Sequence, residues 1–136
     1  MTARPSHRLS TLTPLVCALL AGCGPGDGGA GPALEMPRFD SQDLMAGRAV
    51  WMGTCRNCHL LGVAGAPAVT DPDAWDQRLT KGRGALYASA LGGIKDVHGA
   101  YRMPPQGGNP RLAELDVRRA VDYMLAAVEY LRASGP

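Results

Sequence analysis

Apolar residues recur at helical spacing near the end of the chain. They fall at i, i+3, i+4, i+7, i+8, i+11 and i+14, which is the spacing of one face of an amphipathic helix. The residues are Val117, Ala120, Val121, Met124, Leu125, Val128 and Leu131. Ser134-Gly135-Pro136 ends the pattern. We therefore predict a long C-terminal helix that buries this face.

A less regular apolar pattern predicts a first helix from Asp40 or Ser41 to about Gly53. Both starting residues are good N-caps, because their side-chain oxygens accept hydrogen bonds from the first free backbone N–H groups. Gly47 falls in the interior of this helix, where glycine costs about 0.5–1 kcal/mol relative to alanine. We therefore expect another helix to approach Gly47 closely.

Shorter patterns lie between these two helices. Residues 72–79 have the pattern of a short helix capped by Asp71, and residues 84–91 that of another helix closed by Gly92-Gly93. From there to Gly108, prolines and glycines interrupt the sequence, so we expect a loop with neither helix nor strand pairing. About a hundred residues with these patterns predict one compact domain.

The N-terminus has the pattern of an export signal. A basic start precedes an apolar run, Leu12 to Ala21, that is too short to be a spanning helix. The run ends in Leu20-Ala21-Gly22-Cys23, which resembles a bacterial lipobox, where cleavage leaves an acylated cysteine at the new N-terminus. The alternative is an ordinary signal peptide that happens to contain Cys23. We expect lipid on Cys23 to hold the exported protein on a membrane, on its periplasmic side, with the choice of inner or outer membrane open.

The expected organisation has three parts: a signal peptide over residues 1–22, a lipidated cysteine with a flexible tether over 23–39, and a domain over 40–136. The tether is predicted because Gly- and Pro-rich sequence cannot bury a core. Loss of the signal peptide lowers Lys plus Arg from 14 to 12, which balances the 12 Asp plus Glu. A nearly neutral chain does not support nucleic-acid binding.

The run Cys55-Arg56-Asn57-Cys58-His59 reads C-x-x-C-H, the attachment signature of a c-type haem. Two thiols can form thioethers with the haem vinyl groups, and the adjoining imidazole can bind the iron. A zinc site would need further ligands at suitable spacing, and no second C-x-x-C pair is present. A thioredoxin-like pair would need a βαβ context, and a plain disulfide would not need the histidine. Haem attachment is therefore favoured, and with Cys23 lipidated and Cys17 removed it accounts for every cysteine.

A transfer haem normally has a second axial ligand from the protein. Met103 is the favoured candidate, because it lies in an irregular segment stiffened by Pro104 and Pro105. His98 is the alternative, although a loop histidine is more often a surface residue. Of the other methionines, Met36 falls in the tether, and Met45, Met52 and Met124 fall on helices, where methionine usually fills a core.

These motifs together resemble the class I cytochromes c, and within them the small bacterial cytochrome c5-like group. The resemblance covers roughly residues 40–131. The residues that carry it, in family order, are Gly47, Trp51, Cys55 to His59, Gly65-Ala66-Pro67, Trp75, Arg78, Gly82, Met103-Pro104-Pro105, Gly107-Gly108 and Ala120 to Met124. Two residues depart from the family pattern: Gln106 replaces a frequent lysine, and Ala113 replaces a frequent Ser or Thr cap.

The resemblance implies a small all-α cytochrome c fold wrapped around one covalently bound haem c. The first and last helices would cross at Gly47 and Tyr123. The carbonyl of Pro67 would accept the second ring N–H of His59, which fixes the tautomer. Trp75 and Arg78 would lie near the haem propionates.

The function that follows is one-electron transfer with His59 and Met103 as axial ligands. The expected partners are redox proteins that donate and accept electrons through transient contacts. A gas-binding or sensing haem protein with an open sixth position is one alternative, and a fixed haem subunit of a larger redox complex is another. No nucleophile–base pair or open catalytic metal is apparent, so we do not expect an enzyme.

Overall fold

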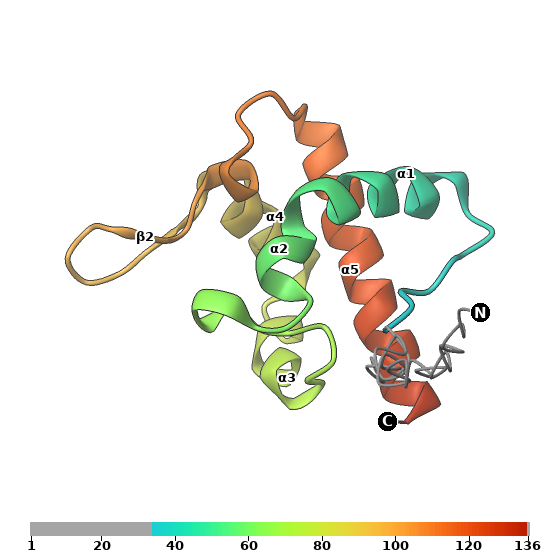
Figure 1. The fold of residues 1–136 in the computed structure, drawn as a ribbon. Helices are drawn as coiled ribbons and strands as arrows, with labels where there is room; N and C mark the ends of the chain where they lie inside the picture. Colours follow the sequence, from blue (N-terminus) through green and yellow to red (C-terminus); the bar gives the residue numbers. More distant parts are fainter. Residues whose placement is uncertain (1–33, 136) are drawn as a thin grey trace, which may run out of the picture. The chain divides into compact units, whose positions relative to one another are not determined.

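The computed structural model describes residues 34–135, and these belong to one compact unit, Leu34–Pro136 (Figure 1). The predicted signal peptide, the lipidated Cys23 and most of the tether lie outside the described residues. Within the described part, no helix is long and apolar enough to cross a membrane. The fold is all-α apart from one short hairpin.

The first helix, α1 (Gln42–Val50), begins where the sequence predicts. Ser41 is its N-cap, and its hydroxyl accepts a hydrogen bond from the Leu44 N–H. The predicted end at Gly53 is wrong, because helical backbone continues through a π-helical turn, η1 (Trp51–Cys55), into α2 (Arg56–His59). The cysteines and histidine of the C-x-x-C-H run are therefore carried on helical turns rather than on a loop.

The last helix, α5 (Glu114–Ser134), crosses α1 at Gly47. A Cβ atom built on Gly47 would lie 2.0 Å from the carbonyl oxygen of Arg119, so only glycine allows the two backbones to approach this closely. The predicted close approach at Gly47 is confirmed. Ala113 precedes α5 without a side-chain cap, and Glu114 and Asp116 in the first turn interact favourably with the helix dipole instead.

Helix α5 buries two faces rather than the single predicted one. The predicted apolar face is buried from Val117 to Val128, with Leu131 partly buried. A second face carries Tyr123 and Ala127, both fully buried. The ring of Tyr123 packs against those of Trp51 and Phe39, with centroid distances of 5.7 and 5.9 Å. The long helix is thus the central element of the domain.

Residues 34–39, which the composition assigns to the flexible tether, pack onto α5. Met36 is 3% exposed and belongs to the core, and the Tyr123 hydroxyl donates a 2.9 Å hydrogen bond to the Pro37 carbonyl. The compact unit therefore begins at Leu34 rather than at Asp40. The glycine-rich composition stops before residue 34. The segment 34–39 contains Met36 and Phe39 instead, and these apolar side chains pack in or against the core.

Two short helices and a hairpin complete the unit. Helix α3 (Asp73–Leu79) has its predicted cap, because the Asp71 carboxylate accepts a hydrogen bond from the Ala74 N–H. Helix α4 (Gly82–Gly92) ends at Gly93, as predicted. The predicted absence of strand pairing after it is wrong: β1 (Ile94–Lys95) and β2 (Tyr101–Met103) pair antiparallel, and a 3-10 turn, η3 (Pro105–Gly108), follows. Figure 1 shows this hairpin projecting from the helical unit.

Candidate haem-binding site

One cavity of about 270 Å³ lies between the C-x-x-C-H turn and α5. Its walls come from the end of α1, from η1, α2, α3, α4, α5 and the hairpin, and from the segments that join them. Apolar side chains of α4 and α5 form much of its lining. They are Leu86, Ala90, Val117, Ala120, Val121, Met124 and Leu125. The cavity therefore offers an apolar surface on the face of α5 that the sequence pattern predicts to be buried.

Cys55, Cys58 and His59 all line this cavity. The two cysteines are free thiols, and burial raises the pKa of Cys55 to about 11. A thiol with this pKa stays protonated at neutral pH and is a poor nucleophile until it is activated. The π-helical turn η1 ends at Cys55, and such turns are frequent at functional sites because they change the direction of the side chains that follow.

His59 is held in one orientation. It is 7% exposed, and its Nδ1–H donates a 3.0 Å hydrogen bond to the Pro67 carbonyl oxygen. This bond leaves Nε2 as the ring nitrogen that can bind a metal. Burial lowers the pKa of His59, and the nearby Arg78 charge adds to this effect, while the bond to Pro67 opposes it. The neutral imidazole, which is the form that binds iron, is therefore favoured.

Two methionines line the cavity. Met103 ends strand β2, and Met124 comes from α5. The structure thus brings Met103, the predicted ligand, to the cavity. It also brings the thioether of Met124 there, although a methionine on a helix usually fills a core. His98 lies at the exposed turn of the hairpin and is not part of the cavity lining. Met36, Met45 and Met52 are not part of it either.

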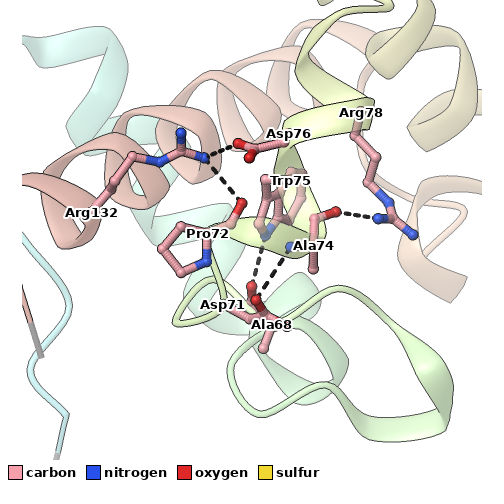
Figure 2. A network of polar contacts seen from close by, with 8 residues as sticks. All are labelled: Ala68, Asp71, Pro72, Ala74, Trp75, Asp76, Arg78 and Arg132. Carbon is pink, nitrogen blue, oxygen red and sulfur yellow. Dashed lines mark hydrogen bonds and ion pairs between the residues drawn. The ribbon is translucent and has the colours of Figure 1, made fainter.

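Trp75 and Arg78 line the cavity from α3, and Figure 2 shows the polar contacts around them. The Trp75 indole N–H donates a 2.7 Å hydrogen bond to the Ala68 carbonyl oxygen, and the Arg78 guanidinium donates to the Ala74 carbonyl within its own helix. The tryptophan donor is therefore already satisfied by backbone. The ring of Trp75 lies 6.2 Å from that of His59, so its contact with the site is through the ring.

The cavity lining carries cations without carboxylates. Arg78, Lys81 and Arg102 line it, and among the described residues no Asp or Glu does. Sequence patterns identify Arg78 but not Lys81 or Arg102, because neither belongs to a motif. Their arrangement is instead fixed by the turn between α3 and α4 and by strand β2.

Comparisons with known proteins agree with this geometry. A family model described as "Cytochrome C oxidase, cbb3-type, subunit III" matches residues 42–124. Cytochrome c-555 of Chlorobaculum thiosulfatiphilum is 40% identical over 83 residues, which cover 61% of this chain and 94% of the relative. Cytochrome c5 of Ectopseudomonas mendocina is 35% identical over 72 residues, which cover 52% of this chain and 76% of the relative.

A solved structure is also similar. It is described as the crystal structure of an electron transfer complex of nitrite reductase with cytochrome c. The matching chain has a TM-score of 0.53 and 38% identity, and the match covers 61% of this chain and 94% of that one.

The fold and the C-x-x-C-H cavity define a c-type cytochrome domain. The chain belongs to the matched family of c-type cytochromes, as a class I, c5-like member.

The residues of the site fit the covalently bound haem c that this family implies. The thiols of Cys55 and Cys58 and the imidazole of His59, whose lowered pKa favours its neutral form, lie on consecutive helical turns that line a largely apolar cavity. The cations of the lining suit the two propionate carboxylates of a haem, because buried or half-buried charges need partners of opposite sign. Cys55, Cys58 and His59 would hold the group.

Proposed function

We propose that this protein is a membrane-tethered, monohaem electron carrier with His59 and Met103 as axial ligands. The observation that supports it is the presence of Cys55, Cys58, His59 and Met103 in the lining of a single cavity. When bound, the haem supplies an iron that alternates between ferric and ferrous states. The protein would be a carrier rather than an enzyme in this proposal, because His59 and Met103 would both bind the iron and leave no position for a substrate.

The chain's residues have separate roles in this proposal. Cys55 and Cys58 fix the cofactor covalently, and His59 is kept in its ligating tautomer by the Pro67 carbonyl. A thioether ligand from Met103 favours the ferrous state and so raises the reduction potential. The apolar side chains of α4 and α5 exclude water from the cavity, which favours the less charged ferrous state in the same direction.

The expected partners are redox proteins that meet the carrier transiently. The similar solved structure, a cytochrome c in an electron transfer complex with nitrite reductase, supports a partner of the oxidoreductase class. Trp75 and Arg78 stay the predicted neighbours of the propionates, with Arg78 the more suitable donor, since the Trp75 N–H is bonded to Ala68.

Lipid attachment at Cys23 is a proposal from the sequence alone, because residues 1–33 lie outside the described part. We expect the exported protein to fractionate with membranes and a Cys23→Ser form to be released. A Cys23→Ser form that still sediments with membranes would remove the lipid anchor from the proposal.

An optical spectrum tests the electron-transfer proposal. We expect a low-spin spectrum with a weak long-wavelength sulfur-to-iron band, and no rapid change when carbon monoxide is added to the reduced protein. Met103→Ala should remove the band and admit carbon monoxide, whereas Met124→Leu should keep the band, because leucine replaces only packing. A high-spin wild-type spectrum would instead support a gas-binding haem protein.

A further inference from the structure

Helices α4 and α5 lie side by side, and one carboxylate joins them (Figure 1). The Asp122 carboxylate of α5 accepts a 2.6 Å hydrogen bond from the Tyr87 hydroxyl and forms an ion pair with Arg83, and both of these partners belong to α4. The guanidinium carbon of Arg118, one helical turn before Asp122, lies 5.1 Å from the centre of the Tyr87 ring. We call Arg83, Tyr87, Arg118 and Asp122 the α4–α5 clamp. These four side chains lie outside the cavity lining.

Tyr87 supplies the stronger part of the α4–α5 clamp. Its hydroxyl donates to a charged acceptor, and such hydrogen bonds are roughly twice as strong as those between neutral groups. Arg83 is mostly exposed, so water and salt screen its ion pair with Asp122. The bond to Asp122 raises the pKa of Tyr87, so the phenol keeps the proton that it donates. Among residues 34–135, no other side chain of α4 forms a hydrogen bond with a different element.

The inward surface of α4 is partly given to the cofactor site. Leu86, Ser89 and Ala90 line the cavity. Surface that lines the cavity is not available for contacts between α4 and α5, and the number of such contacts determines how firmly two elements are packed. The α4–α5 clamp gives α4 direct polar contacts with α5 outside this site. We therefore expect α4 to depend on the clamp more than a helix with a fully packed inner face would.

The position of α4 bears directly on Met103. Gly93 follows the helix immediately and lies against the Met103 carbonyl oxygen, and Ile94 pairs with Met103 across the hairpin. Tyr87 precedes Gly93 by less than two helical turns, so the short helix between them can move as one rigid element. A shift of α4 away from α5 would therefore move the segment that carries Met103.

We propose that Asp122 is a positioning residue for Met103, because it holds α4 through Tyr87 and Arg83, and α4 in turn holds the segment that carries the thioether. The inference rests on the proposed ligation by His59 and Met103, and it names a residue outside the cavity lining on which that ligation depends. Asp122 acts through other residues and does not need to contact the haem. Loss of the α4–α5 clamp should let Met103 leave the site more often.

Imidazole binding to the ferric, haem-loaded protein tests the proposal. Imidazole can bind only after Met103 has left the iron, so at high imidazole concentration the rate constant reaches a limit that measures this departure. Asp122→Ala should raise the limiting rate constant by about five- to thirtyfold. Tyr87→Phe should raise it by about two- to tenfold. Asp122→Asn should fall between the wild type and Asp122→Ala, because its amide oxygen can still accept from the Tyr87 hydroxyl.

Two controls make the same chemical changes elsewhere on α5. Tyr123→Phe also removes a hydrogen-bonded hydroxyl, but that hydroxyl donates to the Pro37 carbonyl and not to α4. Glu129→Ala removes an exposed carboxylate that forms no ion pair within residues 34–135. Both controls should keep the limiting rate constant of the wild type.

Amide hydrogen exchange of the same haem-loaded proteins gives a readout that does not depend on added ligand. In Asp122→Ala, exchange should accelerate over residues 82–92 and 101–108 and stay unchanged in α1. Local opening has this restricted pattern, whereas a loss of overall stability accelerates exchange in the most protected helices as well. Acceleration of equal size in α1 would therefore contradict a positioning role.

The inference is also overturned if Asp122→Ala and Tyr87→Phe keep the wild-type limiting rate constant while the sulfur-to-iron band shows Met103 bound. It is equally overturned if Tyr123→Phe raises that constant as much as Tyr87→Phe does. Tyr87→Phe removes a single oxygen atom, so it decides the matter even where Asp122→Ala does not fold. Failure of the proposed ligation itself looks different: the wild type would lack the band and bind imidazole at a rate that rises with concentration without a limit, and the inference would fall with it.

Discussion

Gly93 lies directly against Met103. A Cβ atom built on Gly93 would be 2.7 Å from the Met103 carbonyl oxygen and 2.8 Å from the Pro105 nitrogen, and Gly93 itself has a φ of +78°, which side chains rarely adopt. The neighbouring pair Ile94 and Met103 is in register across the hairpin. The position of the proposed thioether ligand is therefore set by a glycine in the preceding turn.

Gly93→Ala should displace Met103. We expect the weak sulfur-to-iron band to diminish and the reduction potential to fall, with a loss of stability of about 1–3 kcal/mol from crowding and backbone strain. Gly92→Ala is the matched control, because nothing lies within 4 Å of its added methyl group. Absorption spectra and potentiometry of the two variants compare them. Equal spectra for both variants would show that Gly93 does not position Met103.

Gly47→Ala should separate α1 from α5. Its methyl group would lie 2.0 Å from the Arg119 carbonyl oxygen, so the helices must move apart, at a cost of about 1–3 kcal/mol or more. Gly84→Ala, in helix α4 with open space around it, should instead stabilise the protein by about 0.4–1 kcal/mol. Chemical denaturation measures both changes. Destabilisation of similar size in the two variants would contradict the account of the crossing.

Tyr123→Phe should remove a buried hydrogen bond and a sensitivity to alkali. Loss of the bond to the Pro37 carbonyl costs about 1 kcal/mol. Burial raises the pKa of Tyr123 above its ordinary value of 10.0, and the charges of Arg48 and Arg38 oppose this only in part. Unfolding then favours release of the phenolic proton. The contribution of the buried, protonated Tyr123 to the free energy of unfolding is fully present below its ordinary pKa of 10.0. It is lost as the pH rises through the raised pKa of the folded protein.

The measurement for Tyr123 is the free energy of unfolding as a function of pH. The Tyr123→Phe variant should be less stable at neutral pH but lose less stability between neutral pH and pH 11 than the wild type does. Tyr130→Phe is a suitable control, since the Tyr130 side chain is half exposed. Parallel curves for the wild type and Tyr123→Phe would exclude Tyr123 as the source of the alkaline decline.

Trp75→Phe separates a structural role from a role beside the cofactor. Removal of the indole N–H leaves the Ala68 carbonyl without its donor, which costs about 1–3 kcal/mol. If that bond is the main function of the indole, stability should fall while the reduction potential stays close to the wild-type value. Arg78→Gln, which changes the charge of the cavity lining, should shift the potential instead. A potential shift in Trp75→Phe as large as that in Arg78→Gln would favour direct contact between the indole and a propionate.

Much of the fold could be predicted because it depends on local signals. The stripe from Val117 to Leu131, the caps at Ser41 and Asp71 and the helix-interior Gly47 each report on residues a few positions away or on one close contact. The C-x-x-C-H run identified Cys55, Cys58 and His59 as site candidates for the same reason, since the signature is contained in five consecutive residues.

The remaining features depend on pairings that local patterns do not record. The hairpin consists of strands of two and three residues, too short to show alternation, and its glycines suggested an unpaired loop. Met36 looked like part of a tether because its preceding residues are glycine-rich, yet it is buried, and the adjoining Pro37 carbonyl accepts a hydrogen bond from Tyr123, far away in sequence. Met124 and Lys81 reach the cavity only through the packing of α5 and the turn before α4.

The two buried faces of α5 also separate the start of the described domain from the cavity. Residues 34–39 lie on the face that carries Tyr123, whereas the cavity lies on the face from Val117 to Leu125, and Figure 1 shows the 34–39 segment on the other side of α5 from the hairpin. Helix α5 thus lies between residues 34–39 and the cavity. A partner that approaches the cavity would therefore meet a different surface of the domain from the one on which residues 34–39 pack.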